Sequence, residues 1–279
     1  MINKLKILFN SCVGYLYKII LRIKKYPKLN EGISNYPKII VSLTSYGRRV
    51  ESTVPYAIMS ILNQTYAPNK IVLWLDNSWN IDIIPKSLKD LMKYGVEIRF
   101  CEDIKSYKKL IPTLLAYPKD IIITIDDDII YSRNLIRDLI KGYQLDGNIQ
   151  CSVGIIPQII KPNQFGPYND WIEKNETYTG DYLVPIGAGG ILYPPNSLSL
   201  DVLNKEEFSE LAPNADDLWF WVMAKRIGTK HSCCDINGTN YSFDAIYQFF
   251  HRGSALTHSN AGDSMNDIQL KQIIARFPL

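Results

Sequence analysis

Short apolar runs alternate with amphipathic stretches along the chain from residue 38 onward. The apolar runs predict buried strands, and the amphipathic stretches, with Pro near their starts or Gly at their ends, predict helices. Strands are expected at 38–43, 70–75, 96–101 and 121–125, and helices at 51–63, 85–94 and 109–117. This alternation predicts an α/β fold with a parallel, doubly wound sheet and right-handed crossovers.

The run from Ile121 to Ile125 ends in three consecutive acids, Asp126, Asp127 and Asp128. A continuous apolar, β-branched run predicts a central strand that is covered on both faces. The carboxyl end of such a strand is where open α/β sheets bind their ligands. Three adjacent negative charges repel one another, and a hard divalent cation with oxygen ligands, Mg²⁺ or Mn²⁺, would offset that repulsion. A solvated acidic turn is the alternative, which the apolar run disfavours.

The second half of the chain is less regular. Helices are expected at 133–145, from Asp216 to Arg226 and near 267–276, and a strand at 151–156. The segment 157–182 is rich in Pro, Asn, Gly and aromatic residues, a composition typical of a functional loop or lid. The glycines at 187–190 allow either a tight turn or a close approach of the backbone to a ligand. Acids at the start of a helix, as at 216–217, are ordinarily caps.

Residues 1–28 carry seven basic side chains and no acid. On a helix, the polar residues form one stripe and the opposite face is apolar, with Leu5, Leu8, Phe9, Val13, Leu16, Ile20 and Ile23. A basic amphipathic helix of this kind is typical of peptides that lie in the interface of an anionic membrane, and its uncharged stretch is too short to span one. The alternatives are packing against the catalytic body or a partner and, more weakly, a cleaved signal peptide. Residues 29–37 are expected to be a linker.

The composition limits the classes of protein to which the chain can belong. A chain of 279 residues with 46% hydrophobic residues can bury a large core. The net charge of +3 comes from the first 28 residues, because the rest has 24 basic and 28 acidic residues, which argues against a nucleic-acid-binding body. Five cysteines without metal-ligand spacing favour a reducing cytosol. The adjacent Cys233 and Cys234 are expected to be buried and inert, with a redox pair as the alternative.

Four motifs occur in order at the predicted strand ends and in the first helix: 41–46 (Val-Ser-Leu-Thr-Ser-Tyr), 60–66 (Ser-Ile-Leu-Asn-Gln-Thr-Tyr), 71–78 ending in Asp-Asn-Ser, and the Asp triplet. Together they resemble the nucleotide-sugar half of GT-A glycosyltransferases, close to the family 2-like enzymes of bacterial surface polysaccharides such as capsule, lipopolysaccharide and exopolysaccharide. The resemblance covers 38–135 well and the rest loosely. It implies one GT-A catalytic domain at 38–279, with a nucleotide-binding half at 38–135 and an acceptor-binding half at 136–279.

The resemblance also implies roles for individual residues. Asp126 and Asp128 would hold Mn²⁺ or Mg²⁺, although Asp127 leaves either neighbouring pair possible. Asp76 would accept a hydrogen bond from the uracil of a UDP-sugar, against the alternative of a local Asx turn. Asp217, with Asp216 as second choice, would be the catalytic base of an inverting transfer. The other residues expected at the nucleotide sugar or its metal are Thr44, Tyr46, Lys109, Gly189, Gly190 and His258.

The expected function is transfer of one sugar from a UDP-sugar to a lipid-linked oligosaccharide at the cytoplasmic face of the membrane, where the basic arm at 1–28 would hold the protein peripherally. The sequence lacks the Gln-x-x-Arg-Trp motif of processive synthases. The glycine turn followed by the late acid pair is also similar to retaining hexosaminyltransferases of the same fold. A nucleotidyltransferase and a non-catalytic scaffold of a polysaccharide assembly complex are the remaining alternatives.

Overall fold

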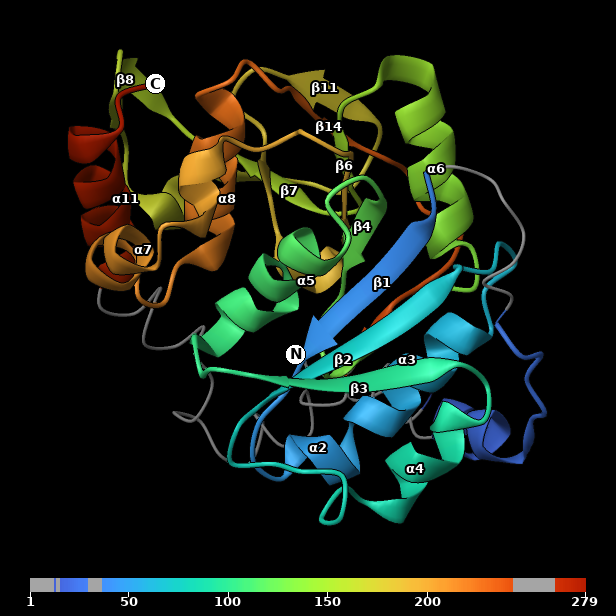
Figure 1. The fold of residues 1–279 in the computed structure, drawn as a ribbon. Coiled ribbons are helices and arrows are strands. Elements are labelled where there is room, and N and C mark those ends of the chain that lie inside the picture. The colour runs from blue at the N-terminus through green and yellow to red at the C-terminus, as the bar shows by residue number, and fades with distance from the viewer. Residues whose placement is uncertain (1–12, 14–15, 30–36, 243–263) are drawn as a thin grey trace, which may run out of the picture.

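A computed structural model describes residues 13, 16–29, 37–242 and 264–279 of the chain. Its centre is an eight-stranded mixed sheet flanked by helices (Figure 1). In spatial order the strands are β11 (Tyr178–Gly180), β14 (His231–Cys233), β6 (Ile149–Cys151), β13 (Ile191–Tyr193), β4 (Ile121–Thr124), β1 (Ile39–Thr44), β2 (Lys70–Asp76) and β3 (Val96–Cys101).

The first four strands of the chain are parallel, as the sequence predicts. β1 pairs with β2 on one side and with β4 on the other, and β2 pairs with β3. β13 breaks the parallel order, because it runs antiparallel to both β4 and β6. It therefore joins the two predicted halves of the domain, 38–135 and 136–279, into one sheet.

Helices cover both faces of this sheet, and each face has its own apolar core. All four residues of β4 are buried, which is the expected position for a central strand. The helices on one face are α2 (Arg49–Ser52), α3 (Val54–Leu62), α4 (Lys86–Met92) and α6 (Leu135–Asp146). Those on the other are α5 (Ile111–Ala116), α7 (Lys205–Leu211), α8 (Asp216–Lys225) and α11 (Met265–Arg276).

Two expected helices are interrupted in the structure. The helix predicted at 51–63 is two helices, because Thr53 leaves the helical conformation at φ −122° before α3 begins. The helix predicted at 109–117 is a 3₁₀ segment, Lys105–Lys109, followed by α5. Both α3 and α5 carry Pro in the first turn, where its missing N–H costs no hydrogen bond.

The region after α6 differs more from the prediction. The strand expected at 151–156 splits, because the chain leaves the main sheet at Ser152 and continues as β7 (Gly154–Ile156) in a three-stranded sheet with β10 (Ile172–Lys174) and β12 (Val184–Pro185). The segment expected to be irregular, 157–182, contains short strands whose partners include segments far away in the chain. Strands this short leave no periodic pattern in a sequence. The other small pairs are β8 (Ile159–Lys161) with β9 (Gln164–Phe165) and β5 (Ile129–Ile130) with β15 (Tyr241–Ser242).

The described part of the basic arm is helical at 16–23. Leu21 is buried against the core, and the Tyr26 hydroxyl donates to the Leu21 carbonyl at 2.6 Å. On the apolar face predicted from the sequence, Leu16, Ile20 and Ile23 are all more than half exposed, and so is the neighbouring Ile19. The described residues include no helix with the length and apolar character to cross a membrane.

Candidate active site

A cavity of about 850 Å³ opens at the carboxyl ends of β1 and β4 and reaches the start of α8. Side chains from segments far apart in the sequence line it together. They include four basic residues, Arg49, Lys105, Lys108 and Lys109, and six carboxylates, Asp103, Asp126, Asp127, Asp128, Asp216 and Asp217. The lining therefore carries a formal excess of negative charge.

The three acids after β4 have different surroundings. Asp127 is buried, and its carboxylate accepts hydrogen bonds from the Ser45 hydroxyl and from Arg49. Burial raises the pKa of Asp127, although Arg49 and Ser45 oppose that rise. Arg49 also pairs with Asp128 at 3.2 Å. The Asp127 carboxylate is therefore bound by side chains of the protein itself. Asp126 and Asp128 have the more exposed carboxylates, with 31% and 16% of each side chain exposed.

Lys109 connects the two acidic groups of the cavity. Its ammonium lies 3.4 Å from Asp126, 3.0 Å from Asp216 and 3.7 Å from Asp217. Burial opposes the charge of Lys109, but the three carboxylates outweigh burial and hold its pKa well above the usual value. A buried lysine so placed is a fixed positive charge between the β4 acids and the start of α8.

Asp217 has the most perturbed carboxylate of the site. Its Oδ2 accepts the backbone N–H of Gly187 at 2.9 Å, and its Oδ1 is buried without a hydrogen-bond partner among the described residues. Burial raises the pKa of Asp217 to about 7, with Lys109 and the Gly187 N–H acting in the opposite direction. A carboxylate with a pKa near neutrality and an open acceptor atom is suited to take a proton from a substrate.

The glycine turn at 187–190 packs against this acid. A Cβ on Gly187 would lie 2.5 Å from Nζ of Lys109 and 2.9 Å from Oδ1 of Asp217, so only glycine allows the approach. Gly190 has φ +91°, in the region that favours glycine. Of the two alternatives for these glycines, the structure shows a 3₁₀ turn at 187–189 whose backbone closely approaches two cavity residues.

The residues after β4 are chemically suited to a divalent cation. Mg²⁺ and Mn²⁺ prefer oxygen ligands, and Mg²⁺ in nucleotide sites is commonly held by one or two carboxylates together with phosphates and water. Asp126 and Asp128 provide two carboxylates, and the excess negative charge of the lining favours a cation. No group of three or more His, Cys, Asp or Glu side chains within the described ranges forms a complete metal site. His258 lies in 243–263, outside the described residues.

Other residues predicted for the site lie at or near the cavity. Thr44 and Tyr46 line it, and Tyr46 is 52% exposed. Asp76 does not line it, and accepts hydrogen bonds from the N–H and hydroxyl of Ser78 in a local Asx turn, which lower its pKa. Gly189 and Gly190 are buried behind Ala188, which does line it.

Several side chains differ from their sequence-based description or were missed. Lys109, expected at the nucleotide sugar, lines the cavity and is buried, and the neighbouring Lys108 is also buried there. Trp219, Trp221 and His231 are buried, and none of them is among the described residues that line the cavity. Arg49 was not predicted at the site, and the only signal was its place in the polar loop after β1. The other cavity residues missed are Ser45, Asp103, Lys105, Ser106, Tyr168, Asn214 and Asn266.

The fold and the cavity define an α/β protein with an acidic cavity at the carboxyl ends of parallel strands, where open α/β sheets bind their ligands. Its sequence matches no protein-family model and no curated protein. Similar solved structures include TarS 1–349 of S. aureus, at 11% identity and a TM-score of 0.49 over 85% of this chain and 72% of that chain. A CMP:2-keto-3-deoxy-manno-octonic acid synthetase complexed with CTP matches at 11% identity and 0.46, over 76% and 96%.

A third similar structure is the mannosyltransferase PcManGT of Pyrobaculum calidifontis in complex with GDP-Man and Mn²⁺. It matches at 12% identity and a TM-score of 0.42, over 81% of this chain and 62% of that chain. At these identities and scores the similarity does not extend to individual site residues. The functional argument therefore rests on the cavity itself.

Proposed function

We propose that the chain is a metal-dependent glycosyltransferase that moves a sugar from a nucleotide sugar, with UDP as the expected nucleotide, to a lipid-linked oligosaccharide acceptor in surface polysaccharide synthesis. One observation carries the proposal: the acids after β4 and the acids that open α8 line a single cavity, with Lys109 between them. A sugar transfer needs this division, with one group for the departing nucleotide and a second, separate group for the acceptor.

The donor half of the cavity would bind the pyrophosphate. Asp126 and Asp128 would hold the cation, which when bound stabilises the negative charge that develops on the leaving nucleotide. Arg49, Lys105 and Lys108 line the same cavity and supply donors to phosphate oxygens. The exposed Tyr46 ring, with Arg49 at 5.5 Å from its centre, offers a flat face to a base. UDP is the nucleotide that the sequence resemblance implies, although Asp76, the residue expected at the uracil, does not itself line the cavity.

The acceptor half would bind the attacking hydroxyl. Asp217 is the proposed base because its Oδ1 has no hydrogen-bond partner among the described residues, and its pKa of about 7 leaves a large fraction ionised at neutral pH. Its Oδ2 is held by the Gly187 N–H, which fixes the direction of the carboxylate. A base that takes the proton from an acceptor attacking opposite the nucleotide gives inversion at the anomeric carbon. Asp216, in salt-bridge contact with Lys109, is the second choice.

The basic arm would bring this cavity to the acceptor. Leu16, Ile19 and Ile23 are exposed on the described helix, and Lys18 and Arg22 lie on the same short segment. Apolar side chains with basic neighbours favour the interface of an anionic membrane. A peripheral position on the cytoplasmic face would place the protein beside a lipid-linked acceptor.

The test is a thermal-shift titration with UDP, GDP and CMP, each with Mn²⁺ or with chelator. A ligand at a hundred times its dissociation constant adds about 2.7 kcal/mol of stability, which is visible as a higher melting temperature. We expect UDP to stabilise the wild type only when Mn²⁺ is present. Asp128→Asn should not be stabilised by UDP with Mn²⁺. Asp90→Asn, which removes an exposed carboxylate on α4, is the matched control and should behave as the wild type.

A second test measures turnover of the same variants. UDP release from a UDP-sugar, with the sugar passing to an added acceptor or to water, should be abolished in Asp128→Asn and retained in Asp90→Asn. A cooperatively melting wild type that no nucleotide stabilises, with or without metal, would contradict the proposed donor site. Nucleotide binding with equal turnover in both variants would contradict the role of Asp128.

A further inference from the structure

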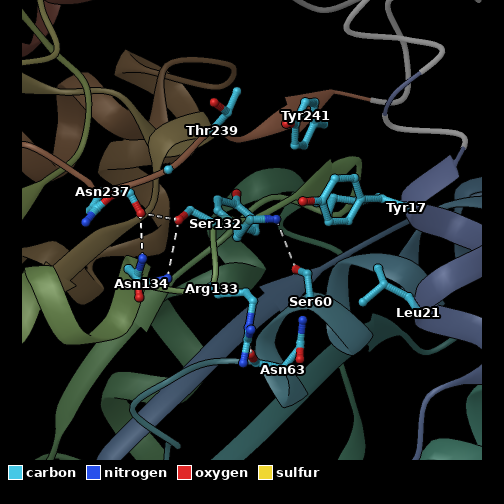
Figure 2. A pocket seen from close by; sticks show the side chains of 13 residues that line it. Tyr17, Leu21, Ser60, Asn63, Ser132, Arg133, Asn134, Asn237, Thr239 and Tyr241 are labelled. Carbon is cyan, nitrogen blue, oxygen red and sulfur yellow. Dashed lines mark hydrogen bonds between the residues drawn. The ribbon is translucent and has the colours of Figure 1, made fainter.

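A second cavity, of about 230 Å³, lies between the helix at 16–23, the end of α3, the start of α6 and the segment 237–241. Figure 2 shows Tyr17 and Tyr241 on one side of it, Asn134 and Asn237 on the other, and Arg133 below. The two tyrosine rings are stacked, with centroids 5.2 Å apart. None of the residues that line the acidic cavity lines this one.

Hydrogen bonds fix the polar wall of this cavity. The Asn237 carbonyl accepts from the Ser132 hydroxyl at 2.9 Å and from the Asn134 amide at 2.7 Å (Figure 2). The Ser132 N–H donates to Asn240 at 2.8 Å. The wall is therefore preorganised by contacts between two distant parts of the chain, which lowers the cost of binding a ligand.

The charge of the second cavity is the opposite of that in the acidic cavity. Among the described residues that line it there is no carboxylate, and Arg133 is the one charged side chain. The Arg133 Nε approaches the Asn63 carbonyl at 3.4 Å, and the Lys24 ammonium donates to the Asn63 side chain. Two positive charges thus meet at Asn63, and Arg133 forms no ion pair with any described residue. A guanidinium that has no carboxylate partner among the described residues, with a second positive charge nearby, favours binding of a phosphate.

The position of the cavity indicates where that phosphate comes from. Tyr17 and Leu21 line it from the same helix whose Leu16, Ile19 and Ile23 are exposed. A phosphate bound there would lie beside apolar side chains that favour acyl chains, which is the arrangement of a phospholipid at a membrane surface.

We propose that this second cavity binds the phosphate of an anionic membrane lipid, with Arg133 as the cation that lines it and Lys24, bound to Asn63, as a second positive charge beside it. The lipid source rests on the proposed membrane association of the arm, but not on the glycosyltransferase reaction. Tyr131 lines this cavity, and its hydroxyl accepts the Asp126 N–H at 2.8 Å, so a lipid bound here would hold the acidic cavity at a fixed distance from the membrane.

The test is sedimentation of the full chain with vesicles of phosphatidylcholine alone and of phosphatidylcholine with phosphatidylglycerol. Arg133→Gln should weaken binding to the anionic vesicles about tenfold, because it removes a charge-assisted contact as well as surface attraction. Lys271→Gln removes an exposed charge from α11 on the opposite face of the sheet and should weaken it by less than about twofold. Arg133→Lys should restore most of the binding, since it keeps the charge.

The other outcomes overturn the proposal in distinct ways. Equal losses in Arg133→Gln and Lys271→Gln would show general surface attraction and no site. A wild type that inorganic phosphate stabilises against heat, but whose Arg133→Gln variant binds anionic vesicles normally, would show a site for free phosphate and not for lipid. The stabilisation by UDP with Mn²⁺ should be unchanged in Arg133→Gln, so failure here and failure of the proposed transferase are separate results.

Discussion

Replacing Asp217 with Asn removes the proposed base while keeping the size of the side chain. The pKa of Asp217 rises from its ordinary 3.8 to about 7 because burial disfavours the charge. Each pKa unit corresponds to about 1.4 kcal/mol, so ionised Asp217 costs the folded state about 4 kcal/mol in total. The folded state holds this proton more tightly than the unfolded state. The contribution of protonated Asp217 to the free energy of unfolding is therefore fully present below pH 3.8 and is lost as the pH rises through about 7.

Two measurements follow from that shift. In the wild type, kcat/KM for UDP release should rise with pH with a midpoint near 7, because only the ionised carboxylate accepts a proton. Asp217→Asn should lower kcat by about 10²- to 10⁴-fold, the usual range for a lost general base. In urea unfolding, the variant should gain stability relative to the wild type by about 2.5 kcal/mol between pH 5 and pH 8.

The controls separate Asp217 from its neighbours. Asp90→Asn should leave both the rate and its pH profile unchanged. Asp216→Asn should lower the midpoint, because the negative charge of Asp216 helps to raise the pKa of Asp217, but it should keep the rise of the rate with pH that Asp217→Asn loses. Turnover of Asp217→Asn within tenfold of the wild type, or an unchanged difference in stability between pH 5 and pH 8, would refute the reasoning.

The other contacts of the site give two more predictions. Lys109→Met leaves three carboxylates facing one another without their shared cation. It should lower the free energy of unfolding by about 3–5 kcal/mol in urea at pH 8. A loss of unfolding free energy no larger than that of Lys271→Met would contradict this. Gly187→Ala places a methyl group 2.5 Å from Nζ of Lys109 and should displace Asp217, lowering kcat strongly at a stability cost of about 1–3 kcal/mol. Normal turnover of Gly187→Ala would show that the turn does not position the acid.

The first half of the fold was well predicted because its patterns are local. β3 has the expected limits, and β1, β2, α4 and α6 lie within two residues of theirs at each end. A strand buried on both faces, or a helix closed by a glycine at positive φ such as Gly147, carries its signal within a few residues. The short strands from β8 to β12 were not predicted, and the strand predicted at 151–156 is split, because partners outside each segment define these strands.

The residues of the candidate site also differ in whether a local pattern of the sequence could predict them. The Asp triplet could be found because its place at the end of an apolar strand is a local property. The Asp217 position came from resemblance, since acids at a helix start are ordinarily caps. Neither Arg49 nor the burial of Lys109 could be predicted, because each depends on acids that approach only in the folded chain.

The sequence by itself determined an α/β protein with carboxylates at the end of a central strand and a basic amphipathic arm. Periodicity and strand-end position decide such features before any tertiary contact forms. Only the tertiary structure decided that Arg49 pairs with Asp127 and Asp128. It also decided that Lys109 lies between two acidic groups, and that the Gly187 N–H donates to Asp217. It also placed Arg133 and Lys24 at one asparagine beside the arm. These contacts join residues far apart in the chain, and their energies depend on burial that no local pattern encodes.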